Sequence, residues 1–291
     1  MSRRGVAGMA VLVGLASLGG WQVWRAERNL DDSLRTRLAA MTVAHGSARS
    51  TCGEASQRPL RLLILGQSNA GNHGAETEVP TRADNAQTVD VFTPQGCWRG
   101  PAPLPGGTGT HQSIWTRLGP HLATQGLDRP IQVALMAVDA TTIADWTRAG
   151  SPLRVQFDGW LQELQRAGVR ADVILWQQGE SDARLGTTAQ RYVEGMEQLR
   201  AHLTQRGASA PLVMARSTRC RSSGGQAIRS AQDTLVARHA DMRIGPDTDV
   251  LDGDHRVNDC HFTRQGLDAA AQAWARGLAP LLRGAGAPIA P

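Results

Sequence analysis

Short apolar segments alternate with amphipathic helical segments along most of the chain, and this alternation constrains the fold. The apolar segments are bounded by Gly, Pro or polar residues, as expected of strands buried on both faces; they cover 60–65, 88–92, 131–138, 171–176, 211–215 and 242–244. Apolar residues at helical spacing cover 113–125, 153–167, 188–206, 227–239 and 263–283. Strands that alternate with helices form a parallel sheet covered on both faces, so the sequence predicts an α/β fold.

The length and charge of the chain restrict its class. A chain of 291 residues can bury one substantial core without being divided into two domains. The formal net charge is +5 and every basic residue is Arg, but the arginines are scattered rather than gathered in a stripe. One Tyr and three Phe also leave few side chains on which bases stack. We therefore expect no nucleic-acid partner.

The amino terminus contains a candidate membrane segment. Arg3 and Arg4 precede residues 5–24, which carry no charge and end in Trp21 and Trp24. This segment is long enough to span a bilayer as a helix, and no clear small-x-small cleavage site follows it. We favour an uncleaved signal anchor in the inner membrane over a cleaved signal peptide, which would give a secreted protein. The predicted parts are a cytoplasmic segment 1–4, the anchor 5–24, a juxtamembrane stalk 25–51, a globular domain 52–284 and a flexible tail 285–291.

The four cysteines indicate disulfide bonds. None forms a C-x-x-C pair, so the sequence gives no support for a structural zinc site. An even number of cysteines behind an export signal predicts two disulfides. We pair Cys52 with Cys97 and Cys220 with Cys260, because each pair flanks a candidate active-site segment. Disulfides require an oxidising compartment, so we expect the globular domain in the periplasm or outside the cell.

The first predicted strand ends in a polar turn with the sequence GQSNAG, residues 66–71. In open α/β sheets, ligands bind outside the carboxyl ends of the strands, so Ser68 stands where a nucleophile would stand. The glycine spacing is that of a phosphate loop, but Asn72 and His73 replace the Lys and Ser/Thr of that motif. An ordinary turn after a core strand is the other alternative.

Two later segments carry further candidate residues. The sequence WQQGESD, residues 176–182, follows a central strand, and DGDHRVNDCHFTRQG, residues 252–266, precedes the last helix. Gln178 is expected to face the same crevice as Ser68, although capping of the next helix is an alternative for it. A Ser, a Gln and an Asp-x-His, each at the end of a strand, form a recurrent geometry for acyl transfer.

Together, GQSN, WQQGESD and DCHF resemble the SGNH/GDSL hydrolase superfamily, and within it the sialate O-acetylesterase-like and acetyl-xylan-esterase-like branch. Residues 107–118 and 140–146 resemble further segments of that branch. The resemblance spans roughly residues 60–280. It implies a three-layer α/β/α sandwich with a mainly parallel, flavodoxin-like sheet, and an esterase that needs neither a metal nor an organic cofactor.

The resemblance also assigns roles to residues. Ser68 matches the nucleophile and His261 the general base. The oxyanion donors match the backbone N–H of Ser68, the N–H of Gly109, which we prefer to Gly107, and the side-chain amide of Gln178. Four further residues are expected to support or order the site: Gln67, Asn69, Glu180 and Asn258.

The acid of the expected triad departs from the family pattern. The family places an Asp three residues before the His, and Asn258 occupies that position here. An Asn cannot stabilise an imidazolium as a carboxylate does. We assign the acid to Asp259, with Asp254 as a weaker candidate and a Ser–His dyad as the alternative.

The expected function is that of an exported, membrane-anchored serine esterase that removes acetyl groups from a small molecule or glycan. We expect its kcat/KM to fall below a pKa near that of an ordinary histidine, because protonated His261 cannot act as a base. The alternatives are an esterase of other acyl specificity, and a non-catalytic glycan-binding or envelope protein on a degenerate SGNH fold. The sequence predicts no oligomeric state.

Overall fold

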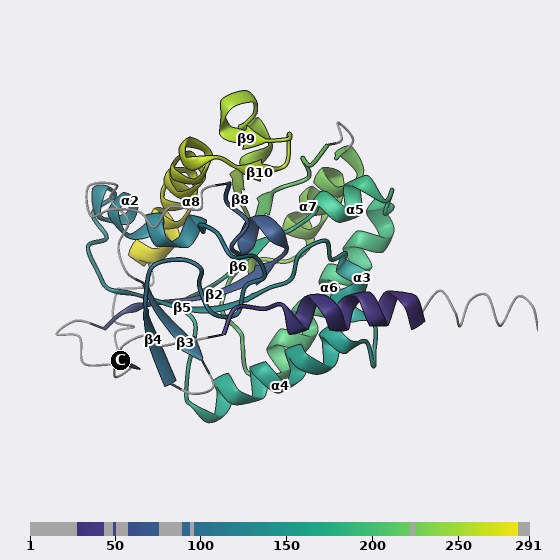
Figure 1. The fold of residues 1–291 in the computed structure, drawn as a ribbon, viewed down its shortest axis with the longest axis horizontal. Coiled ribbons are helices and arrows are strands. Elements are labelled where there is room, and N and C mark those ends of the chain that lie inside the picture. Colours follow the sequence, from purple (N-terminus) through teal and green to yellow (C-terminus); the bar gives the residue numbers. More distant parts are fainter. Residues whose placement is uncertain are drawn as a thin grey trace, which may run out of the picture.

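A computed structural model of the chain describes residues 28–43, 49–50, 58–75, 89–93, 96–221 and 225–284. Its centre is an eight-stranded sheet with the strand order β1-β4-β3-β5-β2-β6-β7-β8. Helices cover both faces of this sheet (Figure 1). The fold is therefore a three-layer α/β/α sandwich, as the sequence predicted.

Most strands of the sheet run parallel to one another. The strands are β1 (Arg49–Ser50), β2 (Leu60–Gly66), β3 (Val89–Thr93), β4 (Gly96–Gly100), β5 (Ile131–Ala137), β6 (Val173–Gln177), β7 (Leu212–Arg216) and β8 (Met242–Asp247). Strands β3, β5, β2, β6, β7 and β8 pair in parallel, and β4 and β1 add an antiparallel edge. The carboxyl ends of the parallel strands therefore share one edge of the sheet, which is where ligands bind in open α/β folds.

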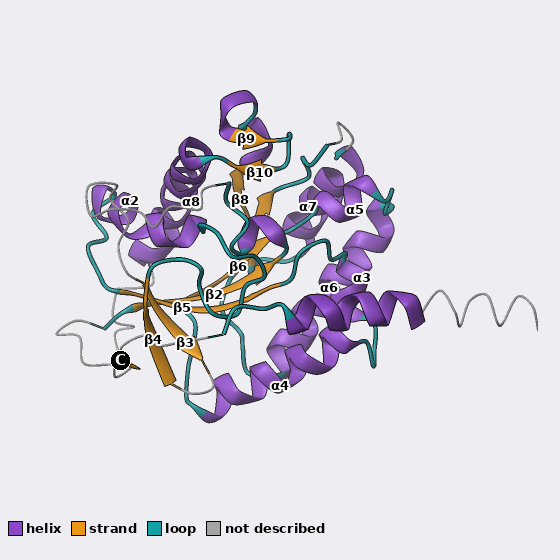
Figure 2. Ribbon diagram, in the orientation of Figure 1, coloured by secondary structure: helices purple, strands orange, loops and turns teal. Residues whose placement is uncertain are grey.

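The helices fall into two layers, shown by secondary structure in Figure 2. They are a helix over 28–39, α2 (Leu118–Thr124), α3 (Ile143–Thr147), α4 (Pro152–Arg166), α5 (Glu180–Arg184), α6 (Ala189–Gln205), α7 (Gln226–Arg238) and α8 (Arg264–Gly284). Helices α2 and α8 pack on one core, and helix 28–39, α3, α4, α6 and α7 pack on the other. Side chains of β2 alternate between them: Ile64 lies in the first core and Leu65 in the second, as a strand buried on both faces requires.

Helix 28–39 belongs to the globular domain. The side chain of Leu34 is fully buried in the second core, and Leu38 packs beside it. The guanidinium of Arg37 donates to the backbone oxygen of Asp139 at 2.7 Å. The spacing of Leu34 and Leu38 gives this helix an apolar side that the sequence analysis overlooked. Residues 28–43 are thus part of the domain rather than a stalk, and the domain begins earlier than the predicted boundary at residue 52.

The described residues contain no helix that is both long and apolar enough to cross a membrane. The predicted anchor 5–24 and the predicted tail 285–291 lie outside the described residues.

One of the predicted disulfides is present. Cys220 and Cys260 are bonded across 40 residues of sequence, as expected. Cys97 is also disulfide-bonded, and its predicted partner, Cys52, lies outside the described residues.

Candidate active site

The turn that carries Ser68 follows directly from the end of β2. Gly66 has φ +152°, and a Cβ there would collide with the carbonyl oxygen of Gln177 on the neighbouring strand β6. The backbone N–H of Gln67 donates to that same oxygen at 3.2 Å. The chain then turns through a short 3-10 helix, Ser68–Ala70. Ser68 therefore lies at the carboxyl end of a central strand, as predicted.

Ser68 and His261 line one cavity of about 310 Å³. His261 lies on β10 (His261–Phe262), a short strand paired with β9 (Arg256–Val257) and placed against the Ser68 turn. Among the described residues no hydrogen bond joins Ser68 to His261, and catalytic hydrogen bonds often tighten only when substrate binds. The fold thus brings together the predicted nucleophile and the predicted base, which are far apart in the sequence.

His261 is a neutral ring at physiological pH. Its pKa is lowered to about 4, first by burial and then by the positive or ionisable neighbours His73, Arg221 and Arg256. Asp139 acts in the opposite direction and raises this pKa. A neutral imidazole accepts a proton, so His261 has the protonation state that a general base needs. This pKa lies below the ordinary histidine value on which the expected pH dependence of kcat/KM rested.

A buried arginine fixes the segment that carries His261. The guanidinium of Arg256 donates to the backbone oxygens of Thr248 at 2.7 Å and Cys260 at 2.5 Å, and it stacks over Phe262 at 4.5 Å from the ring centre. The disulfide to Cys220 holds Cys260 from another direction. The residue directly before His261 is therefore fixed by both a cation and a covalent bond.

Asn69 and Glu180 connect the Ser68 turn to the segment of His261. The side-chain amide of Asn69 donates to Glu180 Oε1 at 2.8 Å and to the backbone oxygen of Cys260 at 3.3 Å. The hydroxyl of Ser217 donates to the same Glu180 oxygen at 2.7 Å. Burial raises the pKa of Glu180 to about 7, although these hydrogen bonds act to lower it. This arrangement suits the ordering role expected for both residues.

The side chain of Gln178 does not face the cavity. Its Nε2 donates to the backbone oxygen of Thr141 at 2.9 Å and to Asp182 Oδ2 at 2.5 Å, and its Oε1 accepts from the hydroxyl of Tyr192 at 3.1 Å. An amide nitrogen has two hydrogens, and both are used here. Gln178 therefore has no N–H left for an oxyanion, and its predicted role is corrected to the support of α5 and α6.

Gln67 is the glutamine that lines the cavity. Its Oε1 accepts the backbone N–H of Ser181 at 3.3 Å, which fixes the orientation of the amide. Its Nε2 has no acceptor among the residues that the structure describes. Only a supporting role was predicted for Gln67, although it stands directly before the candidate nucleophile Ser68.

Gly109 lies against the cavity residue His73. It has φ +91°, and a Cβ at this position would collide with the backbone oxygen of Asn72 and the His73 ring. The part of the chain that the structure describes offers no acceptor for the Gly109 N–H. The N–H of Gly107, the alternative, instead donates to the backbone oxygen of Leu104 at 3.4 Å. Gly109 is thus the better placed of the two glycines for an oxyanion donor.

The acids expected beside His261 lie outside the cavity. Asp259 accepts from the Arg219 guanidinium at 2.5 Å, and its side chain is 44% exposed. Asn258 and Asp259 both have positive φ, 53° and 54°, and Asn258 is exposed, as is Asp254. Within the described residues neither Asp259 nor Asp254 bonds His261. The assignment of Asp259 as the orienting acid is therefore corrected, because this left-handed turn directs it to Arg219.

Two cavity residues were missed in the sequence. The ring of His73 lies 5.2 Å from that of His261, centre to centre, and Asp139 lines the same cavity. Burial lowers the pKa of His73, and Asp139 acts to raise it. Both residues carried a signal: His73 follows Ser68 closely in GQSNAGNH, and Asp139 follows the end of β5, the same position in a strand that drew attention to Ser68.

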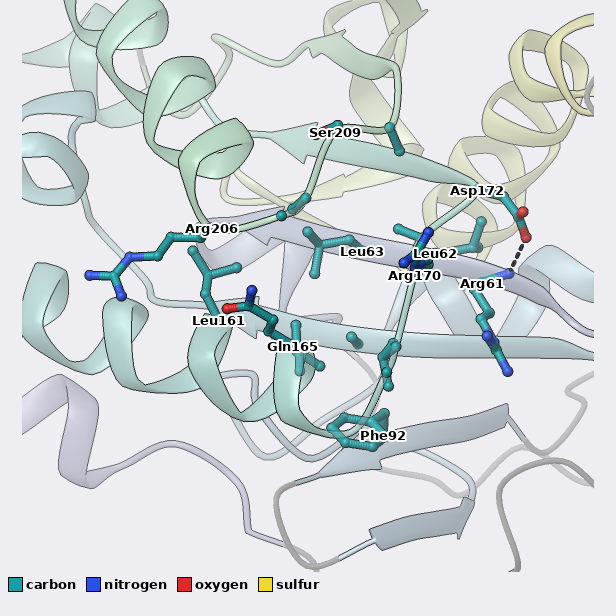
Figure 3. Close-up of a pocket in the computed structure, with 18 of the residues that line it drawn as sticks. Arg61, Leu62, Leu63, Phe92, Leu161, Gln165, Arg170, Asp172, Arg206 and Ser209 are labelled. Atoms are coloured by element: carbon teal, nitrogen blue, oxygen red, sulfur yellow. Dashed lines mark hydrogen bonds between the residues drawn. The ribbon is translucent and has the colours of Figure 1, made fainter.

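A second, larger cavity of about 580 Å³ lies at the opposite end of the sheet (Figure 3). It is formed by the segments that precede β6 and β7, and its labelled polar residues include Arg206, Ser209 and Asp172. The carboxylate of Asp172 accepts the backbone N–H of Arg61 there at 2.9 Å. No histidine lines this cavity among the described residues, so it offers no serine–histidine pair.

Comparisons with known proteins identify a matching family and similar solved structures. The model of the family described as carbohydrate esterase, sialic acid-specific acetylesterase, matches residues 61–279. A solved structure from Arabidopsis thaliana is similar at 20% identity and a TM-score of 0.60, over 78% of this chain and 99% of that chain. Est24, a carbohydrate acetylesterase from Sinorhizobium meliloti, matches at 10% identity and a TM-score of 0.45, over 76% of this chain and 99% of that chain. The structure of NanS is similar at 14% identity and a TM-score of 0.48, over 77% of this chain and 96% of that chain. No curated protein matches the chain.

Proposed function

Because the chain belongs to the sialic acid-specific acetylesterase family of carbohydrate esterases, and is therefore a carboxylic ester hydrolase of the SGNH/GDSL superfamily, we propose that it removes acetyl groups from a carbohydrate through an acyl-enzyme on Ser68. The observation that carries this proposal is the common cavity of Ser68 and the neutral His261. The substrate class rests on the family and on the size of the cavity, which admits an acetyl ester.

The reaction follows from the placement of these groups. His261 accepts the hydroxyl proton of Ser68 while the Ser68 oxygen bonds to the ester carbon, and the electron pair of the C=O bond moves to the carbonyl oxygen. When the tetrahedral intermediate collapses, His261 returns the proton to the departing sugar oxygen. Water then attacks the acyl-enzyme, with His261 again as base and afterwards as acid, and acetate leaves.

The oxyanion needs donors that are free and that face the cavity. The backbone N–H of Ser68 is at the first position of its 3-10 turn, where no partner exists within the turn. The N–H of Gly109 and the Nε2 of Gln67 complete the set. Three such donors fixed before the reaction stabilise negative charge without any reorganisation at the moment of attack.

The test is hydrolysis of p-nitrophenyl acetate, and release of acetate from acetylated xylan and from O-acetylated sialic acid, by the purified full chain. Ser68→Ala should lower kcat/KM by at least about 10³-fold, since the nucleophile is removed. Ser209→Ala is the matched control, because Ser209 is exposed and lines the opposite cavity. Equal rates for Ser68→Ala and the unchanged protein would refute the proposal.

We also propose that the domain works in an oxidising compartment, anchored by residues 5–24 or secreted after their removal. The disulfide between Cys220 and Cys260 supports this, since such bonds are rare where thiols are kept reduced. Fractionation of cells that express the full chain, with thiol labelling before and after reduction, tests the compartment. Recovery with cytosolic markers and labelled Cys220 would contradict it.

A further inference from the structure

His261 receives no carboxylate from its own segment of chain, as far as the structure describes it. Asp259 pairs with Arg219, and Asn258 occupies the position where the family pattern has an acid. An imidazolium that forms in a buried site needs a compensating negative charge, because burial disfavours the charged form. The charged groups that line the cavity beside His261 are Arg184, Arg221, Glu180 and Asp139.

Asp139 is held in the cavity by contacts on both sides of its Cα. Its backbone N–H donates to the hydroxyl of Thr108 at 2.9 Å, and its backbone oxygen accepts from the guanidinium of Arg37 at 2.7 Å. Asp139 follows the end of β5, which pairs in parallel with β2. It is therefore at the same edge of the sheet as Ser68, and its position is fixed by helix 28–39 and by the segment of Gly109.

The backbone of Asp139 lies close to the two histidines of the cavity. The Thr108 hydroxyl that accepts from Asp139 also lies 3.1 Å from Nε2 of His73. The His73 ring in turn lies 5.2 Å from the His261 ring. Both histidines and Asp139 line the cavity of Ser68.

We propose that Asp139 is the positioning carboxylate of this esterase, whose negative charge stabilises the imidazolium of His261 that forms when Ser68 gives up its proton. The inference rests on the proposed function, since it assigns a role within that reaction. No proton moves to Asp139: the proton stays on His261 until it passes to the departing oxygen. Asp139 thus supplies from β5 the charge that the Asn258 position does not supply.

The electrostatics of the cavity agree with this role. His73, Arg221 and Arg256 all act to lower the pKa of His261, and Asp139 acts to raise it. At His73, Asp139 again raises the pKa, whereas burial and His111 lower it. A nearby opposite charge favours the charged form of a group, and this effect needs no direct hydrogen bond.

The first test compares Asp139→Asn with a control at the other end of the same strand. Asp139→Asn should lower kcat/KM at pH 7 by about 10–100-fold, mainly through kcat, because His261 becomes a weaker base. Asp139→Glu, which keeps the charge, should recover part of the loss. The control residue, Asp128, is exposed and precedes β5, whereas Asp139 follows the other end of that strand. The seven residues of β5 separate the two aspartates by about 23 Å, which is well beyond the screening length of about 8 Å. Asp128→Asn should therefore equal the unchanged protein.

The second test measures the charge of the ring rather than the rate. In a protein with ¹⁵N-labelled histidine, the His261 resonances should titrate with a midpoint near the pKa of about 4. In the Asp139→Asn variant, the His261 resonances should remain those of a neutral ring down to about pH 3.5, because the negative charge that favours protonation of the ring has been removed. A contribution to folding alone would change the unfolding midpoint and leave this titration unaltered.

The outcomes separate this inference from the proposed function. If Ser68→Ala abolishes activity while Asp139→Asn keeps both the rate and the His261 midpoint, the role of Asp139 is refuted and the esterase stands. If Asp259→Asn, and not Asp139→Asn, lowers the rate and the midpoint, the acid is Asp259 after all. If activity does not depend on Ser68, the proposed function fails, and the His261 midpoint alone decides whether Asp139 acts on that ring.

Discussion

Replacement of Glu180 by Gln should change how the stability of the protein depends on pH. The carboxyl of Glu180 is fully buried, and its pKa is raised to about 7 from an ordinary value of 4.5. One of its oxygens accepts from Asn69 and Ser217, and the other has no partner among the described residues. Gln keeps the size and an accepting oxygen but removes the charge, so the variant isolates the cost of ionisation.

The magnitude follows from the two pKa values. Below pH 4.5 the carboxyl is protonated in both the folded and the unfolded protein, and it makes no pH-dependent contribution. Between pH 4.5 and 7 the unfolded chain loses this proton and the folded chain keeps it, so the free energy of unfolding falls as the pH rises. A difference of about 2.5 units, from 4.5 to about 7, corresponds to about 3 kcal/mol. Above pH 7 both states are ionised and the loss is complete.

Urea denaturation from about pH 4.5 to 8, followed by the fluorescence of the buried Trp274 and Trp176, measures this effect. The stability of Glu180→Gln relative to the unchanged protein should rise by about 3 kcal/mol from about pH 4.5 to about pH 7.5. Glu194→Gln, at an exposed position on α6, controls for the loss of one negative charge. A difference between Glu180→Gln and the unchanged protein that stays constant over this range would refute the reasoning.

Three further predictions concern the active site and its support. Because the pKa of His261 is about 4, kcat/KM should stay constant from about pH 8 down to about pH 5 and fall by half near pH 4. Initial-rate measurements that place the midpoint of this pH profile near 6.5 would contradict the prediction. Cys220→Ser should lower the free energy of unfolding by about 4 kcal/mol, because it opens a loop of 40 residues. A loss of less than about 1 kcal/mol in urea denaturation would contradict this prediction. Gln67→Ala should lower kcat by about 10²–10³-fold and leave Tm unchanged, because Gln67 is the proposed oxyanion donor. Gln178→Ala should instead lower Tm. If only Gln178→Ala lowers kcat, then Gln178 rather than Gln67 is the oxyanion donor.

The elements of the sheet could be predicted because their signals are local. The run of apolar residues at β2 and the spacing of apolar residues in α6 are properties of short segments, and burial on both faces leaves few alternatives. Strand β4 was not predicted, because Gly96–Gly100 lies in a segment rich in Gly and Pro and is a strand only through its pairing with β3. The buried side of helix 28–39 was not predicted, because the many charged residues of this segment suggested a stalk.

The site was predicted where a residue's place in a strand decides its position. Ser68 follows the end of β2, so the topology of a parallel sheet puts it at the ligand-binding edge wherever its neighbours lie. His261 was identified through the resemblance of its DCHF segment to the family. The partners of these two residues were not predicted, because they depend on the direction of side chains.

The sequence by itself determined the fold class, since periodicity and strand ends are properties of short segments of chain. Its resemblance to a known family indicated Ser68 and His261 as the candidate nucleophile and base. Only the tertiary structure decided which of the two glutamine amides and which aspartate line the cavity. Gln67 rather than Gln178 does so because Thr141 and Asp182 take both amide hydrogens of Gln178. Asp139 rather than Asp259 does so because the turn at Asn258 directs Asp259 to Arg219, while β5 brings Asp139 beside a histidine 122 residues later in the chain.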